Sequence, residues 1–263
     1  DDARGEAHDL TIRLRASVEG DRVVLDFSGS DPQHPGNLNC PLAVTESACF
    51  FAMRSLVAAG APACSGTWRP ITVLAPEGSI VNAIPPAAVA AGNVETSSRI
   101  ADLVFAAFGH AQGQGTMNNL TLGNDHFTHY ETFGGGQAAQ PDAHGPSAVH
   151  VAMSNTLNTP IEALELEFPL RVIEYALRPG SGGVGRYRGG DGMIREVEAL
   201  AEMRYSLIAE RRRHAPRGAS GGGDGACGRD SVDGRQIPGK SVGTLRAGSR
   251  LRIETPGGGG FGR

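Results

Sequence analysis

The sequence lacks any long apolar run, and its 263 residues contain no stretch that could form a membrane span. A membrane-spanning helix needs about 20 predominantly apolar residues. The first six residues also lack the basic and then apolar order of a secretory signal. We therefore expect a cytoplasmic protein without a membrane partner.

Positive charge is sparse, with Lys240 as the only lysine and with 24 Lys and Arg against 28 Asp and Glu, for a net charge of −4. Because nucleic-acid binding needs a basic surface, no nucleic-acid partner is expected. Only four cysteines occur, without C-x-x-C spacing or the density of a secreted disulfide framework. These thiols are predicted to be reduced and structural.

What the chain does have is 38 glycines and 16 prolines, without a collagen repeat and with 40% hydrophobic residues. Such a composition predicts a folded chain rich in tight turns. Two helices are expected early, at 42–59 and after a cap at Thr96 or Ser97, with Gly109 ending the second. A hairpin is expected from 10–14 and 22–27, and short strands from 71–84.

Beyond residue 110 the helical period almost disappears. The strands predicted there are 117–122, 127–133, 149–153, 170–177, 193–200, 205–208 and 250–253. One short helix is expected to begin with a capping box at Thr159 and Glu162. The glycine-rich tail 255–263 is predicted to be a loop that closes on its neighbours. The fold class is α+β, with an α+β part over 1–110 and a β-rich part over 111–263 that form one continuous region.

Three segments match functional motifs but lack the required context. Gly234 to Ser241 fits the phosphate-binding G-x-x-x-x-G-K-S pattern, 180–185 fits G-x-G-x-x-G, and 218–222 fits G-x-S-x-G. Each motif needs a helix directly after it, and glycines follow in all three cases. We interpret all three segments as turns.

Several polar residues point to a ligand site. His129 and Glu131 lie two apart on a predicted strand and so share a face. His150 precedes a run of amides and hydroxyls that includes Asn155 and Asn158. Polar groups beside a core strand need hydrogen-bond partners or a ligand. Roles in bracing a loop and in binding a ligand are about equally compatible with this run.

Two further clusters carry amides and a carboxylate. Asn93 and Glu95 directly precede the second helix, whose free N–H groups favour an anion, although Glu95 could equally serve as a cap. Asn118 and Asn119 are adjacent, so on a strand they would face opposite sides, and at most one would serve a given pocket.

These segments together resemble the hydantoinase B/5-oxoprolinase family, which includes the acetone carboxylase alpha subunit. The resemblance is carried by Gly36-Asn37-Leu38-Asn39-Cys40-Pro41, Ala91-Gly92-Asn93, Gln114-Gly115-Thr116-Met117-Asn118-Asn119, Tyr130-Glu131-Thr132-Phe133-Gly134-Gly135-Gly136, Met153-Ser154-Asn155-Thr156 and the Thr255 to Gly260 tail. It spans nearly the whole chain. Members of the family are longer, and the match is to their C-terminal half, so this chain would be a fragment, a split subunit or part of a larger structure.

The resemblance implies a component of an ATP-dependent cyclic-amide hydrolase that opens 5-oxoproline or hydantoin. A hydantoinase A-like partner would bind ATP and Mg²⁺, and the N-terminal half of hydantoinase B would supply a divalent metal, Mn or Zn. A hetero-oligomer with a small cyclic amide as substrate is therefore expected, and no metal ligand is assigned in this chain.

By the same resemblance, Glu131 and His150 are the candidate acid/base or orienting groups. The candidates for the pocket lining are Asn93, Glu95, Asn118, Asn155 and Asn158. Ala152 stands where many relatives carry a second histidine. The alternatives are the alpha component of an ATP-dependent ketone carboxylase and a non-catalytic assembly module that only docks the nucleotide-binding partner.

Overall fold

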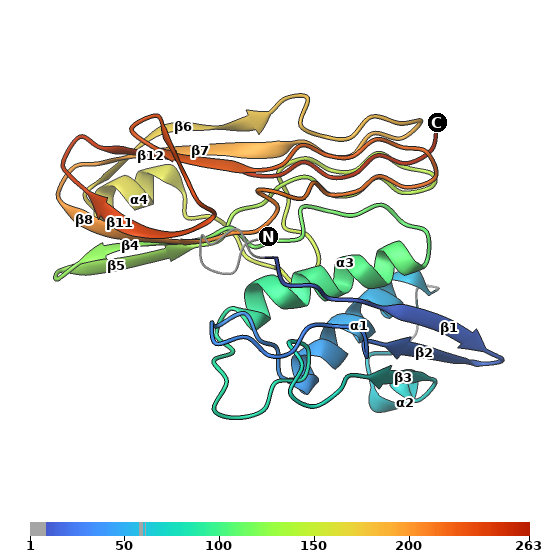
Figure 1. Cartoon of the computed structure of the whole chain (residues 1–263). Helices are drawn as coiled ribbons and strands as arrows, with labels where there is room; N and C mark the ends of the chain where they lie inside the picture. The colour runs from blue at the N-terminus through green and yellow to red at the C-terminus, as the bar shows by residue number, and fades with distance from the viewer. Residues whose placement is uncertain (1–8, 58–59, 61) are drawn as a thin grey trace.

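A computed structural model describes residues 9–57, 60 and 62–263. It has the predicted α+β class, with few helices and mostly antiparallel sheets. Figure 1 shows a lower layer, which holds the first three helices and a small sheet, and an upper layer that holds the remaining strands and one short helix. No helix in the described part of the chain is long and apolar enough to cross a membrane.

The lower layer is built on two helices that pack against each other. Its elements are β1 (Arg15–Glu19), β2 (Arg22–Asp26), α1 (Leu42–Leu56), α2 (Ser65–Trp68), β3 (Ile71–Leu74), the π-helical turn η1 (Gly92–Thr96) and α3 (Ser97–Ala107). β2 pairs antiparallel with β1 and parallel with β3. Buried Phe27, Cys49, Ile100 and Val104 join the sheet and both helices in one core, which stabilises the layer through the removal of apolar area from water.

The prediction of a strand at 10–14 is wrong, because the strand that pairs with β2 is Arg15–Glu19. The alternation of Leu10, Ile12 and Leu14 has another cause, since all three pack against the core. The backbone of Thr11 bonds with Asp31 instead of a neighbouring strand: its N–H donates to Asp31 Oδ2 at 2.7 Å, and its carbonyl accepts the Asp31 N–H at 2.9 Å.

The helix predicted over 42–59 ends at Leu56, and positions 58–59 lie outside the described residues. The expected cap of the second helix is also wrong. Thr96 donates its hydroxyl to Leu38 O, and Ser97 donates to Asn93 O at 2.5 Å. Because η1 runs directly into α3, no free amide remains there for a cap. Of the strands expected over 71–84, only β3 forms.

The upper layer consists of two sheets with the orders β10-β9-β12-β7-β6 and β11-β8-β4-β5. Its elements are β4 (Asn119–Asn124), β5 (Phe127–Glu131), α4 (Ile161–Glu167), β6 (Leu170–Arg178), β7 (Gly192–Ala199), β8 (Met203–Ile208), β9 (Arg229–Val232), β10 (Arg235–Ile237), β11 (Lys240–Leu245) and β12 (Arg250–Glu254). Alternate residues of these strands form one core, including Leu122 of β4, Leu207 of β8 and Leu251 of β12, with Leu164 of α4.

Two expectations for this layer are corrected. Residues 149–153 form no strand: Val149 makes an isolated bridge to Gly135, and a turn follows in which Met153 has φ +66°. The capping box is also wrong, since Pro160 is the N-cap of α4 without a side-chain cap, and the Thr159 N–H donates to Glu131 Oε1 at 2.6 Å. β9, β10 and β11 are polar or interrupted by glycine, so their sequences carried no strand signal.

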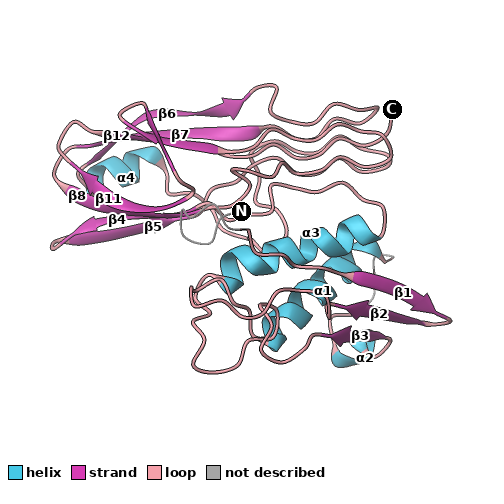
Figure 2. Cartoon of the chain, viewed as in Figure 1, coloured by secondary structure: helices cyan, strands magenta, loops and turns pink. Residues whose placement is uncertain are grey.

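Glycine-rich segments extend from the upper sheets as side-by-side chains that are not strands (Figure 2). Gly183 N–H donates to Gly258 O at 2.8 Å, and Gly258 N–H donates to Gly190 O at 2.9 Å. A Cβ on Gly258 would lie 2.0 Å from Gln137 O. Only glycine fits such contacts, as at the axis of collagen. The predicted closure of the 255–263 tail on its neighbours is confirmed.

The three motif-like segments have no helix after them. Segments 180–185 and 218–222 belong to the glycine-rich chains, and Gly234 lies in the turn between β9 and β10. Lys240 begins β11, so a strand stands where a phosphate-binding loop needs a helix N-terminus. The absence of a helix after each segment is as predicted, but the interpretation of 234–241 as a turn holds only at Gly234, because 235–237 form β10 and 240–241 begin β11.

Candidate functional site

A cleft of about 720 Å³ lies between α3 and the segment that follows β8. Its polar lining includes Glu95, Arg99, Gln112, Glu210, Arg211 and Arg217. η1 and α3 supply the first two residues, while β8 delivers Glu210 and Arg211 from the upper layer. The cleft therefore lies where the two layers meet, and it combines carboxylates with guanidinium groups.

Glu95 is a buried carboxyl group, 1% exposed. Its Oε1 accepts the Asn119 Nδ2–H at 2.9 Å and the Met117 N–H at 3.4 Å, whereas Oε2 has no partner of hydrogen-bond geometry among the described residues. Burial and the charge of nearby Glu210 raise the pKa of Glu95 to about 8. The interpretation of Glu95 as a helix cap is therefore not supported, because its carboxyl contacts Met117 and Asn119 at the start of β4.

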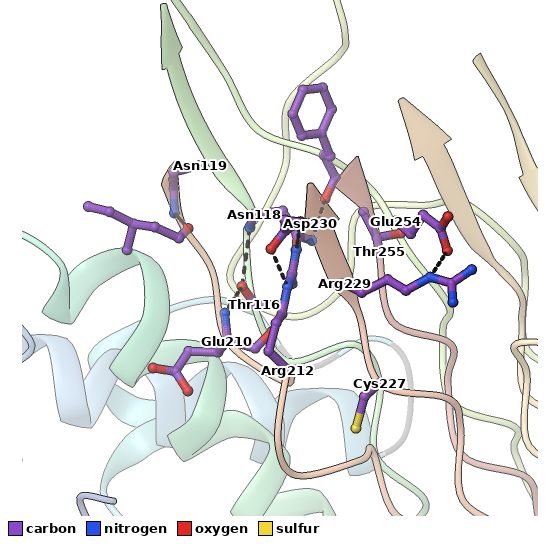
Figure 3. A network of polar contacts seen from close by, with 12 residues as sticks. Thr116, Asn118, Asn119, Glu210, Arg212, Cys227, Arg229, Asp230, Glu254 and Thr255 are labelled. Carbon is purple, nitrogen blue, oxygen red and sulfur yellow. Dashed lines mark hydrogen bonds and ion pairs between the residues drawn. The ribbon is translucent and has the colours of Figure 1, made fainter. Parts of the chain in front are cut away.

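Glu210 is the second buried carboxyl group of the cleft and is paired with the only lysine, Lys240 of β11. Its N–H donates to Thr116 Oγ1 at 3.1 Å. Burial disfavours the ionised form, but the charges of Lys240 and Arg99 outweigh burial and hold the pKa of Glu210 well below its ordinary value. Figure 3 shows its carboxylate pointing away from Arg212, toward the helices.

Arg211 is a buried guanidinium group at the junction of the two layers, with φ +61°. It donates to Asp102 Oδ2 of α3 at 2.6 Å and to Gln112 Oε1 at 3.1 Å. Arg99 Nη1 lies 3.8 Å from the same Asp102 oxygen. Burial lowers the pKa of Arg211 to about 10, so the group stays cationic at neutral pH. One carboxylate thus holds two arginines at the cleft.

Asn118 belongs to a buried network around Arg212, which is joined to the backbone of Glu210 through Thr116 Oγ1 and through a hydrogen bond from Arg212 Nη1–H to Glu210 O (Figure 3). Its Oδ1 accepts Arg212 Nη1–H at 2.6 Å, and Arg212 pairs in a bidentate manner with Asp230 at 2.7 and 2.8 Å. Asn118 has φ +48° and precedes β4, while Asn119 begins the strand and bonds Glu95. The two side-chain amides thus have different partners, and of the two Asn119 is the one whose side chain bonds a residue lining the cleft.

Glu131 lies at the end of β5 in a third cluster. Its Oε2 is 3.7 Å from His129 Nε2 and 3.8 Å from Arg195 Nη2, and its Oε1 accepts the Thr159 N–H. Burial raises the pKa of Glu131, but the nearby His129 ring, the hydrogen bond from the Thr159 N–H and the charge of Arg195 outweigh burial and lower it overall. His129 and Glu131 do share a face, as the spacing predicts.

His150 lies close enough to Glu131 for that charge to act on its pKa, which burial lowers. Its ring nitrogens bond Ser154 Oγ at 2.8 Å and Thr156 Oγ1 at 3.2 Å. Thr156 also bonds Thr132 Oγ1, and Asn158 Nδ2–H donates to Thr132 O at 2.8 Å. The structure therefore brings Glu131, His150 and Asn158 together.

Asn93 and Asn155 are exposed and belong to none of the three groups described above. The other site residues predicted from sequence are thus distributed over three different places in the structure. Glu95 lines the cleft, Asn118 lies in the Arg212 network, and Glu131, His150 and Asn158 form the third cluster. Sequence reasoning missed Glu210, Arg211 and Arg99. The available signal was the charged run Glu210-Arg211-Arg212-Arg213-His214 directly after the predicted strand 205–208.

By the family resemblance, ATP and Mg²⁺ are expected on the partner and the divalent metal on the N-terminal half, and neither is expected on this chain. The described residues contain no group of three His, Cys, Asp or Glu placed to hold a metal ion. In the segment 234–241, a turn and strand residues stand where nucleotide binding would need a helix N-terminus, and Lys240 is paired with Glu210. No chemical step of this chain is assigned to a metal or to ATP.

The fold of this chain is also found in a protein of known crystal structure. The crystal structure of the ATP-dependent caprolactamase from Pseudomonas jessenii matches 96% of this chain and 48% of its own with a TM-score of 0.84 and 23% identity, which shows a shared fold.

The whole chain, residues 1–263, matches the model of the family described as hydantoinase B/oxoprolinase, so it belongs to that family. It is 42% identical to 5-oxoprolinase 1 of Arabidopsis thaliana over 259 residues, which cover 95% of this chain and 20% of that protein. It is 31% identical to a Pseudomonas sp. protein whose name describes the B component of a D-/L-hydantoinase, covering 97% of this chain and 47% of that protein. The chain thus spans less than half the length of these relatives, and the predicted resemblance is confirmed.

Proposed function

We propose that this chain is the C-terminal part of the B-type component of an ATP-dependent cyclic-amide hydrolase that opens 5-oxoproline or hydantoin rings. In this proposal a hydantoinase A-like partner uses ATP to phosphorylate the ring carbonyl oxygen, and the present chain binds the activated ring. The observation that carries the proposal is the cleft in which Arg99 and Arg211 lie beside Glu95 and Glu210. Family membership supports the same reaction class.

The chemistry explains why such a cleft is useful. An amide carbonyl is stabilised by resonance, and phosphorylation of its oxygen creates an electrophilic carbon that water can attack. Negative charge then develops on the oxygens of the water adduct, the C–N bond breaks to leave an acyl phosphate, and a second water releases the phosphate from it. Fixed cationic N–H donors in a site shielded from water stabilise that charge more strongly than water does. Arg99 and Arg211, both held by Asp102, are such donors.

The proposal has a direct test in the complete complex. The full-length protein that contains this chain is purified with its ATP-binding partner, and ATP hydrolysis is measured with 5-oxoproline, with hydantoin, and with acetone plus bicarbonate. We expect ATP turnover only with a ring substrate, together with its ring-opened product. Turnover only with acetone and bicarbonate would identify a ketone carboxylase instead. An assembled complex inactive with all three would favour the assembly-module alternative.

A cleft variant locates the activity in this chain. Arg99→Ala is expected to lower kcat/KM by about 10²-fold, the scale of a lost charge-stabilising donor. Arg250→Ala is the matched control, because Arg250 is half-exposed on β12 and pairs with Glu198, and neither residue lines the cleft. Equal activity of the two variants would show that Arg99 and the cleft take no part in the reaction.

A further inference from the structure

Glu95 and Glu210 form an unequal pair of carboxyl groups inside one cleft. Both are at least nine-tenths buried and both line the cleft. Thr116 is near both residues, because its Oγ1 accepts the backbone N–H of Glu210 at 3.1 Å and its hydroxyl favours the ionised form of Glu95. Two like charges so close in a poorly solvated site cannot both form without compensation. The compensation in this site is unequal.

The nearby positive charge acts mainly on Glu210. Lys240 contacts Glu210 directly, and Arg99 adds to its stabilisation as a carboxylate. Among the described residues, the donors that hydrogen-bond Glu95 are neutral, the Asn119 amide and the Met117 N–H, and both reach Oε1. The Thr116 hydroxyl and the charge of Lys240 also favour the ionised form, but burial and the charge of Glu210 outweigh them. Tyr130, whose hydroxyl donates to Asn119 Oδ1 at 2.7 Å, is a neutral neighbour of the same group. The proton of the pair therefore belongs on Glu95, and Oε2 is the oxygen left without a partner.

We infer that Glu95 donates a proton to the ring nitrogen when the amide bond of the substrate breaks, and that Glu210 and Lys240 are positioning residues that keep that proton on Glu95. This inference rests on the proposed function. As the C–N bond breaks, its electron pair stays on nitrogen, and the proton of Glu95 Oε2 forms the new N–H bond. Glu95 is left as a carboxylate and regains a proton from water. An unprotonated nitrogen is a poor leaving group, so a positioned acid is needed.

The protonation of the pair is measured first, without substrate. The full-length protein is labelled with ¹³C at the glutamate side-chain carboxyl, and the NMR resonances are followed from pH 4 to pH 10. One glutamate resonance is expected to titrate near pH 8, and it should be missing in Glu95→Gln. A Glu95 resonance that titrates near the ordinary value of 4.5 overturns the inference.

Glu210→Gln tests the coupling within the pair. Removal of the like charge, with Lys240 still present, should move the Glu95 titration down by about one pH unit or more. Glu198→Gln is the matched control, because Glu198 lies on β7 and pairs with exposed Arg250. That variant should leave the Glu95 resonance in place. An unmoved resonance in Glu210→Gln would contradict the coupling.

The pH dependence of turnover in the complete complex tests proton donation. The wild type is expected to lose kcat/KM above pH 8, as Glu95 ionises. Glu95→Gln should reduce the rate by about 10²- to 10⁴-fold, remove that alkaline limb, and leave KM less affected than kcat. Glu210→Gln should move the limb to lower pH by the same amount as the NMR titration. Wild-type ring opening with an unchanged rate in Glu95→Gln overturns the inference and leaves the proposed function standing. No ring opening by the wild type overturns the proposed function itself.

Discussion

Asp102→Ala gives the sharpest test of how the two layers are joined. Asp102 on α3 is 3% exposed and binds Arg211, which is 2% exposed and comes from the segment after β8. The variant leaves a buried guanidinium group without its carboxylate. Breaking a buried pair by removing one partner costs about 3–5 kcal/mol, because the remaining charge stays desolvated. The equilibrium constant for unfolding should thus rise by a factor of at least about 100.

The measurement is urea unfolding of the chain followed by far-UV circular dichroism, with fluorescence of Trp68, the only tryptophan, as a second probe. Glu198→Ala is the control, because its partner Arg250 is half-exposed at 3.3 Å and such surface pairs contribute about 0–1 kcal/mol. Replacing both buried partners, as in Asp102→Leu with Arg211→Met, should recover much of the loss. A loss in Asp102→Ala no larger than in Glu198→Ala would refute the reasoning.

Three further predictions concern other parts of the chain. Gly258→Ala should lower the free energy of unfolding by about 3 kcal/mol or more, because the new Cβ would lie 2.0 Å from Gln137 O. Gly66→Ala is its control and should cost nothing, because its Cβ would meet only Cys64 Sγ at 3.7 Å. Calorimetric Tm values that do not differ between the two variants would contradict this prediction. Cys64 should react first with a thiol reagent, because it is exposed and a hydrogen bond with Thr67 lowers its pKa, while burial raises the pKa of Cys40 to about 11 and of Cys49 to about 12. Mass spectrometry follows the order of modification, and early modification of Cys49 would contradict the prediction. Glu95 has a folded-state pKa of about 8 against an ordinary 4.5, so the folded state binds more protons between these values, and the wild type should lose stability as pH rises from about 4.5 to about 8. Urea unfolding at pH 5, 6, 7 and 8 should give a flatter dependence of the unfolding free energy on pH for Glu95→Gln. Parallel dependences for wild type and variant would contradict the assignment.

The sequence predicted best those features that depend on local pattern. The apolar period of α1 and α3 and the alternation in β4, β7 and β8 identified these elements, because each buries one face. The strand predicted at 10–14 was wrong, because the alternating side chains of this segment pack against the core although its backbone does not pair with a strand. β11 was missed because its pairing with β8, and not its own composition, makes it a strand.

The candidate site depended on contacts that local pattern does not encode. Glu95 was identified because it precedes a helix, yet its partners are Asn119, 24 residues away, and Glu210, which reaches the cleft by way of β8. The Arg211–Asp102 bond spans 109 positions. Glu131 and His150 do lie in one cluster, and their catalytic role stays a prediction. Distant pairing of charged groups requires the fold to be known.

The most direct measurement is a crystal structure of the complete complex with 5-oxoproline and a non-hydrolysable ATP analogue. We predict that the ring is bound in the cleft between α3 and the segment after β8, with its nitrogen within hydrogen-bond distance of Glu95 and its carbonyl side toward Arg99 and Arg211. A ring seated instead beside Glu131 and His150, with the cleft holding only solvent, would contradict the account.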